Sequence, residues 1–216
     1  PTYASLPLPG IQPVLMDEKR NEIEGNQVTG SLCIKFPWPG IARTIWGDHQ
    51  RYKETYFSTF PGKYFTGDGA LRDEVGYYRI TGRVDDVVIV SGHNLGTAPI
   101  EDAINEHPAV AESAIVGFPH DIKGNALYGF VILKETGEYR DRENLSKEIN
   151  QHISDHIGPI AKLDKIQFVS GLPKTRSGKI MRRILRKIAE GDYSNFGDTS
   201  TLLNPEIVDE IKDGKI

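Results

Sequence analysis

The chain has 216 residues, with 30 acidic and 26 basic side chains and a formal net charge of −4. This length can bury a substantial core in one large or two small domains, and the acidic excess argues against a general nucleic-acid binder, which usually carries a strong basic excess. No apolar run approaches the roughly 18 residues of a membrane-spanning helix. From the charge and from this absence together, we expect neither nucleic acid nor a membrane as a partner.

The cysteine content and the first residues bear on the compartment and on the extent of the chain. Cys33 is the only cysteine, so no intramolecular disulfide can form, and a reducing, cytoplasmic compartment is the simplest prediction. Because Cys33 lies in the apolar run 31–36, we expect a buried structural thiol rather than a nucleophile. The chain begins at Pro1 and enters a strand-like segment without a preceding helix. We therefore expect a fragment of a longer protein.

The first part of the chain predicts a small β-rich unit. Residues 12–36 alternate short apolar runs with turn clusters, which is typical of short strands and hairpins. The Pro-Trp-Pro-Gly sequence at 37–40 ends this pattern, and residues 43–59 predict either a short helix or a loop. We expect the aromatic rings around this segment to fill the core rather than to form a stacking surface for bases; they are Trp38, Trp46, Tyr52 and Tyr56.

Asp68 lies between two glycines, in the sequence Tyr-Phe-Thr-Gly-Asp-Gly-Ala at 64–70. Glycines allow unusual dihedrals and close backbone approach, and a carboxylate held at such a turn can accept hydrogen bonds from both hydroxyls of a ribose. The alternative is an ordinary turn aspartate. The hairpin continues to Asp85 and Asp86, which would point to opposite faces of an extended chain. We therefore predict a boundary or hinge there and not a metal pair or an acid/base dyad.

The rest of the chain alternates strands and helices, which predicts a compact second unit of the α/β or α+β type. Turn residues separate the apolar runs, and one helical segment carries an apolar side chain every four residues. The polar tail from Gly191 is expected to dock loosely, with at most a last helical turn or two around Ile207, Val208 and Ile211. The predicted strands are 87–90, 110–118, 127–134 and 164–169, with a turn at 119–124; the predicted helices are one that starts at Pro99 and stops before Pro108, one that carries Leu145, Ile149, Ile153 and Ile157, and 180–190.

A basic loop precedes the last of these helices, with the sequence Leu-Pro-Lys-Thr-Arg-Ser-Gly-Lys-Ile-Met-Arg-Arg at 172–183. Lys179 follows Gly178, so a cation stands beside a flexible turn, and such a loop suits phosphate or carboxylate ligands. It is not a Walker A motif, because Pro173 and Ile180 occupy the places of its first glycine and its Ser or Thr. On residue types alone, a solvated basic cap of the helix or a nucleic-acid patch remains an alternative.

Three segments together, 64–70, 80–86 and 172–183, resemble the adenylate-forming superfamily, and within it the AMP-forming synthetases that activate acetate. Residues 38–44 and 197–201 extend the resemblance over nearly the whole chain. It implies that 1–84 is the β-rich end of a large N-terminal domain. Residues 85–216 would then be a small, mobile C-terminal α/β domain with a three-stranded type of sheet and flanking helices, and Asp85 would be the hinge. The implied fold class is α+β.

The resemblance also implies a reaction and a set of site residues. Enzymes of this kind use ATP to convert a carboxylate to an acyl-adenylate and pyrophosphate, and then transfer the acyl group to CoA. Lys179 would be catalytic and would bridge the carboxylate and the α-phosphate, while Asp68 would bind the ribose hydroxyls and Arg83 the nucleotide. Rotation at Asp85 would then withdraw Lys179 and bring Ser91 and Gly92 to CoA. The family also implies Mg²⁺ at Asn105, His107 and Val110; the alternative is that His107-Pro108 is only a helix stop.

Two positions depart from the pattern that the resemblance implies. Asn94 and Ser154 stand where arginines that contact the ATP phosphates and CoA, respectively, are common, so those contacts are expected to be weaker or differently arranged. Acetate is the implied substrate, and propionate or another short acid is the alternative, because the acyl pocket would lie upstream of Pro1. A second alternative is a non-catalytic module that serves as a substrate for an acetyltransferase and a deacetylase at Lys179, where acetylation would remove the charge.

Overall fold

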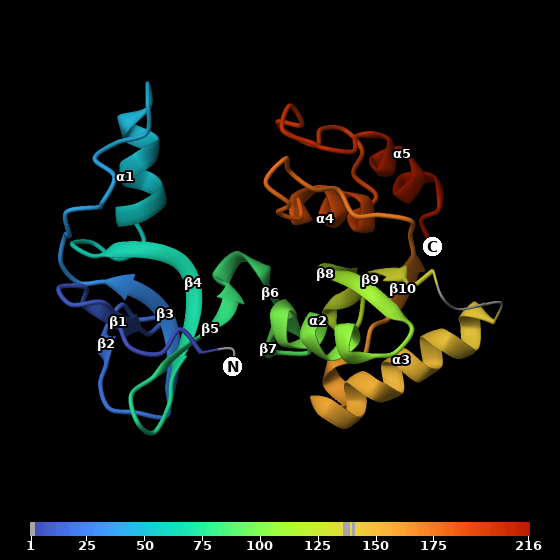
Figure 1. Cartoon of the computed structure of the whole chain (residues 1–216), viewed down its shortest axis with the longest axis horizontal. Helices are drawn as coiled ribbons and strands as arrows, with labels where there is room; N and C mark the ends of the chain where they lie inside the picture. The colour runs from blue at the N-terminus through green and yellow to red at the C-terminus, as the bar shows by residue number, and fades with distance from the viewer. Residues whose placement is uncertain (1–2, 136–138, 140) are drawn as a thin grey trace. The chain divides into compact units, whose positions relative to one another are not determined.

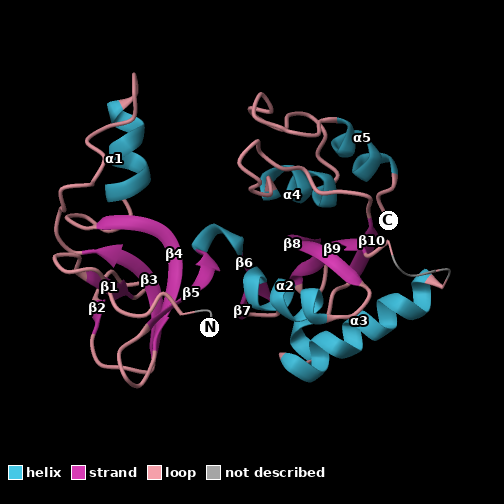
Figure 2. Ribbon diagram, in the orientation of Figure 1, coloured by secondary structure: helices cyan, strands magenta, loops and turns pink. Residues whose placement is uncertain are grey.

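The structure is a computed structural model that describes residues 3–135, 139 and 141–216. Its internal contacts divide the chain into two compact units, Pro1–Asp85 and Asp86–Ile216 (Figure 1). Each unit contains its own β-sheet, and helices accompany both sheets (Figure 2). The predicted α+β class is therefore confirmed.

The first unit is built on a five-stranded antiparallel sheet with strand order β2-β1-β3-β4-β5. The short apolar runs and turn clusters do form hairpins, as predicted. The alternative left open at 43–59 resolves to a helix, which the Asp48 carboxylate caps by accepting a hydrogen bond from the Arg51 N–H at 2.9 Å. The elements are β1 Pro13–Met16, β2 Glu22–Ile23, β3 Val28–Ile34, α1 His49–Phe57, β4 Tyr64–Arg72 and β5 Tyr78–Arg83.

Two predictions about the burial of single side chains can be compared with the core of the first unit. Cys33 is fully buried, and burial raises the pKa of its thiol to about 12. The thiol therefore stays protonated at neutral pH, which confirms a structural role. Trp46, in contrast, is 97% exposed, so its predicted place in the core is wrong. It precedes α1 in a segment that is neither helix nor strand, whereas Tyr52 lies on α1 and is buried.

The second unit contains five strands in one sheet, so the three-stranded sheet implied by the resemblance is wrong. Strand β9 pairs with β8, β6 and β10, and only the β9–β10 pair is parallel. The extra strand that the sequence did not reveal is β7, a short polar segment that forms a hairpin with β6. The strands are β6 Val87–Val90, β7 His93–Gly96, β8 Val110–His120, β9 Gly124–Leu133 and β10 Lys165–Phe168.

Helices cover both faces of this sheet, in two hydrophobic clusters. On β8, Ile115 packs into the cluster under α2 and α3, whereas its neighbours Ala114 and Val116 pack into the cluster under α4 and α5. Because both faces are covered, the middles of β8 and β9, at 114–118 and 126–133, are continuous apolar runs. The helices are α2 Thr97–Glu106, α3 Arg142–His156, α4 Arg182–Glu190 and α5 Glu206–Asp213 (Figure 2).

Three further predictions, about the end of one helix, the C-terminal tail and one turn, are wrong in part. Ile157 lies beyond α3 and is 39% exposed, because the chain leaves the helix toward Gly158, whose φ is +131°. The tail does not dock loosely: Ile207, Val208 and Ile211 on α5 are buried in the second cluster. The turn predicted at 119–124 is shorter, since β8 continues to His120 and β9 begins at Gly124.

Candidate functional site

Asp68 and Arg83 face each other across neighbouring strands of the first unit. They are paired residues of β4 and β5, and Arg83 Nη1 lies 3.5 Å from Asp68 Oδ1. The Arg83 side chain is 50% exposed, and an ion pair so exposed contributes only about 0 to 1 kcal/mol to stability. Stability therefore explains little of this arrangement. It offers a carboxylate and a guanidinium side by side to a polar ligand.

The backbone around Asp68 is shaped to allow this contact. Gly67 has φ +80°, and a Cβ there would lie 2.6 Å from the Arg83 guanidinium nitrogens. Arg83 Nη1 donates to the Thr66 carbonyl at 3.2 Å, and the Asp68 N–H donates to Thr66 Oγ1 at 3.1 Å. A glycine at 67 thus lets the guanidinium lie directly over the turn, and the register shift after Gly69 turns the strand at the same place.

The two adjacent acids at the boundary bind different partners. Residues 84–86 form a 3₁₀ turn, so the expectation of an extended chain at Asp85 and Asp86 is wrong. Asp85 Oδ1 accepts a hydrogen bond from Arg83 Nε at 3.0 Å in the first unit. Asp86 Oδ1 accepts one from Arg186 Nη2 at 3.2 Å in the second unit. The boundary between the two units falls between these two carboxylates.

Lys179 lies on a short hairpin of the second unit. Lys174 and Ile180 form an antiparallel bridge, the Thr175 N–H donates to the Lys179 carbonyl at 2.8 Å, and the Lys179 N–H donates to Thr175 Oγ1 at 3.1 Å. Gly178 closes the turn with φ +81°. These bonds fix the backbone of Lys179 on both sides while its side chain stays exposed.

The other cations of this segment are mostly committed to partners. Lys174 pairs with Glu112 at 2.6 Å, Arg182 pairs with Glu101 at 2.6 Å, and Arg183 donates to the Asp198 carbonyl. Among the residues that the structure describes, the Lys179 ammonium has neither a hydrogen bond nor an ion pair. The five cations of 172–183 therefore differ: Lys174, Arg182 and Arg183 bind partners within the fold, while Arg176 and Lys179 are exposed and Lys179 is open to an anion.

Glu101 and its partners are a charge network that the sequence did not reveal. Glu101 is buried on α2, where it accepts hydrogen bonds from the Ile115 N–H at 2.8 Å and from Arg182 Nη2 at 2.6 Å. Burial raises the pKa of Glu101, and the bond to Arg182 opposes that shift. In the sequence, only the place of Glu101 on the same helix face as Ile100 and Ile104 could have indicated that it is buried. This network attaches the helix behind Lys179 to α2.

The residues predicted to contact CoA or phosphate lie on a hairpin and on α3. Ser91 and Gly92 have φ values of +49° and +82° and form the two-residue turn between β6 and β7. Asn94 follows on β7, opposite Ile89, with its side chain exposed. Ser154 lies apart in sequence, half-buried on α3. The backbone N–H groups of such a turn and a neutral amide can bind polar groups, but they carry no cation.

The residues implied for Mg²⁺ offer a poor set of side-chain ligands. Asn105 Oδ1 accepts from Ser113 Oγ at 2.9 Å, His107 Nδ1 accepts from the Ala109 N–H at 3.3 Å, and Val110 is apolar and buried. Mg²⁺ prefers oxygen ligands in octahedral geometry, with carboxylates among them. These three side chains supply no carboxylate, so they do not fit Mg²⁺, and no chemical step is assigned to the ion at this place.

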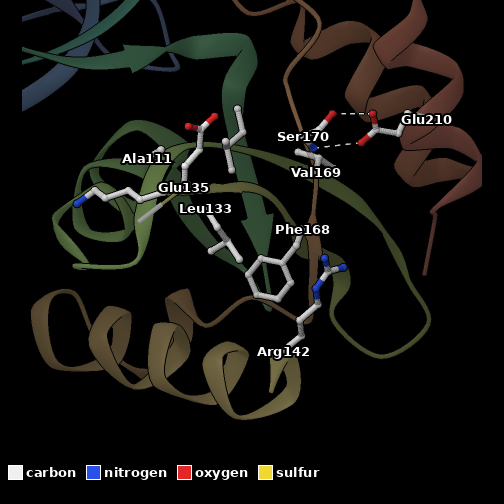
Figure 3. A pocket seen from close by; sticks show the side chains of 10 residues that line it. Ala111, Leu133, Glu135, Arg142, Phe168, Val169, Ser170 and Glu210 are labelled. Carbon is white, nitrogen blue, oxygen red and sulfur yellow. Dashed lines mark hydrogen bonds between the residues drawn. The ribbon is translucent and has the colours of Figure 1, made fainter. Parts of the chain in front are cut away.

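A cavity of about 810 Å³ lies elsewhere on the second unit, between the β8–β9–β10 edge and α5 (Figure 3). Some of its polar groups already have partners: Ser170 donates to Glu210, and the Arg142 guanidinium lies over the Phe168 ring. None of the sequence-predicted site residues lines it. The cavity therefore adds nothing to the candidate site.

Comparison with known proteins agrees with this geometry. The family model for the AMP-binding enzyme C-terminal domain matches residues 99–179, which include Lys179. The solved structure of an ATP-bound RpMatB-BxBclM chimera is similar over 90% of this chain and 37% of its own, with 28% identity and a TM-score of 0.76. The anthranilate CoA ligase AuaEII in complex with anthranoyl-AMP matches 89% of this chain and 36% of its own, with 26% identity and a TM-score of 0.76. The chain belongs to the adenylate-forming superfamily.

Within that superfamily, the acetyl-CoA synthetases are close relatives. The acetyl-coenzyme A synthetase of Parvibaculum lavamentivorans is 58% identical over 215 residues, which are 100% of this chain and 33% of that protein. The Vibrio vulnificus enzyme is 58% identical over 211 residues, or 98% of this chain and 32% of that protein. The chain thus spans about a third of the length of these relatives. No helix among the described residues is long and apolar enough to cross a membrane.

Proposed function

We propose that this chain is the lysine-bearing C-terminal part of an acetyl-CoA synthetase, which uses ATP to convert acetate to acetyl-AMP and pyrophosphate and then transfers the acetyl group to CoA. The observation that carries the proposal is the exposed Lys179, fixed on its hairpin without a partner among the described residues. The 58% identity to acetyl-CoA synthetases supports the choice of acetate.

Lys179 supplies the charge that adenylation needs. The attacking carboxylate and the α-phosphate are both anions, and an ammonium between them lowers their repulsion most where negative charge concentrates in the transition state. Lys174 and Arg182 are paired with glutamates, so Lys179 and Arg176 are the exposed cations of this loop, and of the two it is Lys179 that directly follows the Gly178 turn. In the second half-reaction, a rotation of residues 86–216 at Asp85 would withdraw it and present the Ser91-Gly92 turn to CoA.

Asp68 and Arg83 supply the nucleotide contacts in this proposal. The Asp68 carboxylate would accept hydrogen bonds from the ribose hydroxyls, and Arg83 would contact the nucleotide beside it. Their pairing at 3.5 Å supports this role, because it presents both side chains on one face of the β4–β5 pair.

Lys179 acetylation by an acetyltransferase, reversed by a deacetylase, would remove the adenylating charge. We place this chemistry in the cytoplasm, which suits a chain whose single cysteine, Cys33, is buried and forms no disulfide.

The decisive experiment measures acetate- and ATP-dependent pyrophosphate release. The 216-residue chain alone is compared with the same chain joined to the upstream part of a full-length acetyl-CoA synthetase. We expect activity only in the joined form, because Lys179 needs an acyl and ATP site that these residues do not supply. Activity of the chain alone would support a self-sufficient enzyme, and no activity in either form would support the non-catalytic module. Replacing acetate by propionate tests the alternative substrate.

Asn94 provides a further test, because asparagine brings no charge to the phosphates. We expect Asn94→Arg in the joined enzyme to lower KM for ATP and for pyrophosphate, since an exposed guanidinium on β7 would add an attraction for phosphate. Asn94→Gln, which lengthens the side chain without charge, is the control. Unchanged KM values in Asn94→Arg would show that this position does not contact the phosphates.

A further inference from the structure

Three side chains at the junction of α2 and α3 gather outside the site described above. Glu106 is the last residue of α2, and His152 and His156 are one helical turn apart on α3. One ligand atom from each of the three lies within 4.8 Å of the others, and His156 Nε2 is 3.9 Å from Glu106 Oε2. The spacing of four residues places both imidazoles on one face of the helix. These contacts join two helices that are far apart in sequence.

One histidine ring is oriented by a hydrogen bond, and the other has a buried nitrogen without a partner among the described residues. His156 Nδ1 lies 2.8 Å from the His152 carbonyl, and a carbonyl only accepts, so Nδ1 carries the hydrogen and the neutral ring presents the Nε2 lone pair toward Glu106. His152 Nε2 is buried and has no hydrogen-bond partner among the described residues. A backbone bond of this kind is what orients metal-binding imidazoles in proteins.

We propose that Glu106, His152 and His156 form a binding site for a divalent transition metal ion, with Zn²⁺ as the metal that fits them. Two imidazoles and one carboxylate, with a fourth position for water, match the ligand set of open zinc sites. Tetrahedral bonds of about 2.0 to 2.2 Å place neighbouring ligand atoms about 3.3 to 3.6 Å apart. The spread of 4.8 Å in the structure therefore needs only small side-chain rotations to close. Glu106 and His156 are exposed, which gives the ion a path of entry.

His107 is a neighbour of this site and not one of its ligands. Its Nδ1 accepts a hydrogen bond from the Ala109 N–H, so the neutral ring carries its hydrogen on Nε2 and has no second lone pair. The ring meets His152 edge to face at 5.7 Å and thereby limits its rotation. The site differs in ligands and in metal preference from the Mg²⁺ position considered above, because imidazole suits zinc and carboxylate-rich oxygen sites suit magnesium.

The test is isothermal titration of ZnCl₂ into the untagged, chelator-treated 216-residue chain. We expect saturable binding of one Zn²⁺ per chain, which excess Mg²⁺ does not displace. His152→Ala, His156→Ala and Glu106→Gln should each weaken binding at least about tenfold, since loss even of an outer-shell group costs 10- to 100-fold. His49→Ala, which removes an exposed histidine of the first unit, should bind as the parent does.

The alternative is that these side chains form only an ion pair and a ring contact. In that case Zn²⁺ binding would be unsaturable, would be displaced by Mg²⁺, or would be the same in the three variants as in the parent. Any of these results would overturn the proposal. Circular dichroism of each variant shows whether α3 is intact, and His156→Gln, which keeps a polar side chain of similar length, separates loss of a metal ligand from loss of helix packing.

Discussion

Replacing Lys179 by alanine in the joined synthetase is expected to slow adenylation about 10²- to 10³-fold, the usual cost of removing one group that stabilises transition-state charge. The acetyl transfer from preformed acetyl-AMP to CoA should stay near the parent rate, because in our proposal Lys179 is withdrawn during that step. Pyrophosphate release measures the first half-reaction, and acetyl-CoA formation from synthetic acetyl-AMP measures the second. We thus expect the variant to lose adenylation activity selectively and to keep acetyl transfer.

Two variants make this result specific to the ammonium of Lys179. Arg176→Ala removes an exposed cation from the same hairpin and should leave both half-reactions close to the parent. Lys179→Gln copies the neutral, extended shape of acetyl-lysine and should behave like Lys179→Ala. Equal slowing of both half-reactions by Lys179→Ala would contradict the proposed withdrawal. Adenylation within about threefold of the parent would remove Lys179 from the chemistry altogether.

Local patterns predicted most of the fold because most of its elements are amphipathic or buried on both faces. The middles of β8 and β9, residues 114–118 and 126–133, read as continuous apolar runs, and the apolar side chains at 145, 149 and 153 read as one helix face. The failures fall where tertiary contacts decide. Strand β7 has little apolar character and depends on pairing with β6, and α5 is helical in a polar tail because its three apolar side chains close the second core.

In the candidate site too, short sequence motifs predicted some features, and tertiary contacts determine the others. Motif resemblance could propose Asp68, Arg83 and Lys179, since each lies in a distinctive short sequence. It could not show which cations of 172–183 are open, because that depends on Glu101 and Glu112, which lie far away in sequence. Nor could it pair Glu106 with His152 and His156, which are brought together only by the packing of α2 on α3.

Removing the Arg182 side chain is expected to destabilise the second unit by about 3 kcal/mol, a typical cost of leaving one member of a buried ion pair without its partner. Arg182→Ala would leave the buried Glu101 carboxylate with the Ile115 N–H but without its guanidinium. Urea unfolding followed by far-UV circular dichroism measures the loss. Both tryptophans lie in the first unit, so the midpoint from tryptophan fluorescence should stay unchanged and serves as an internal control.

The pH dependence and a double variant identify the charge of Glu101 as the cause. Burial already raises the pKa of Glu101, and loss of Arg182 raises it further. The folded state then holds a proton that the unfolded state releases, so stability falls as pH rises through the folded pKa. The loss in Arg182→Ala should therefore be smaller at pH 5 than at pH 8. The double variant Glu101→Gln with Arg182→Ala should recover much of the lost stability, because the neutral amide still accepts the hydrogen bond from the Ile115 N–H. If the loss of stability were independent of pH and the double variant did not relieve it, the cause would be lost packing and not the charge of Glu101.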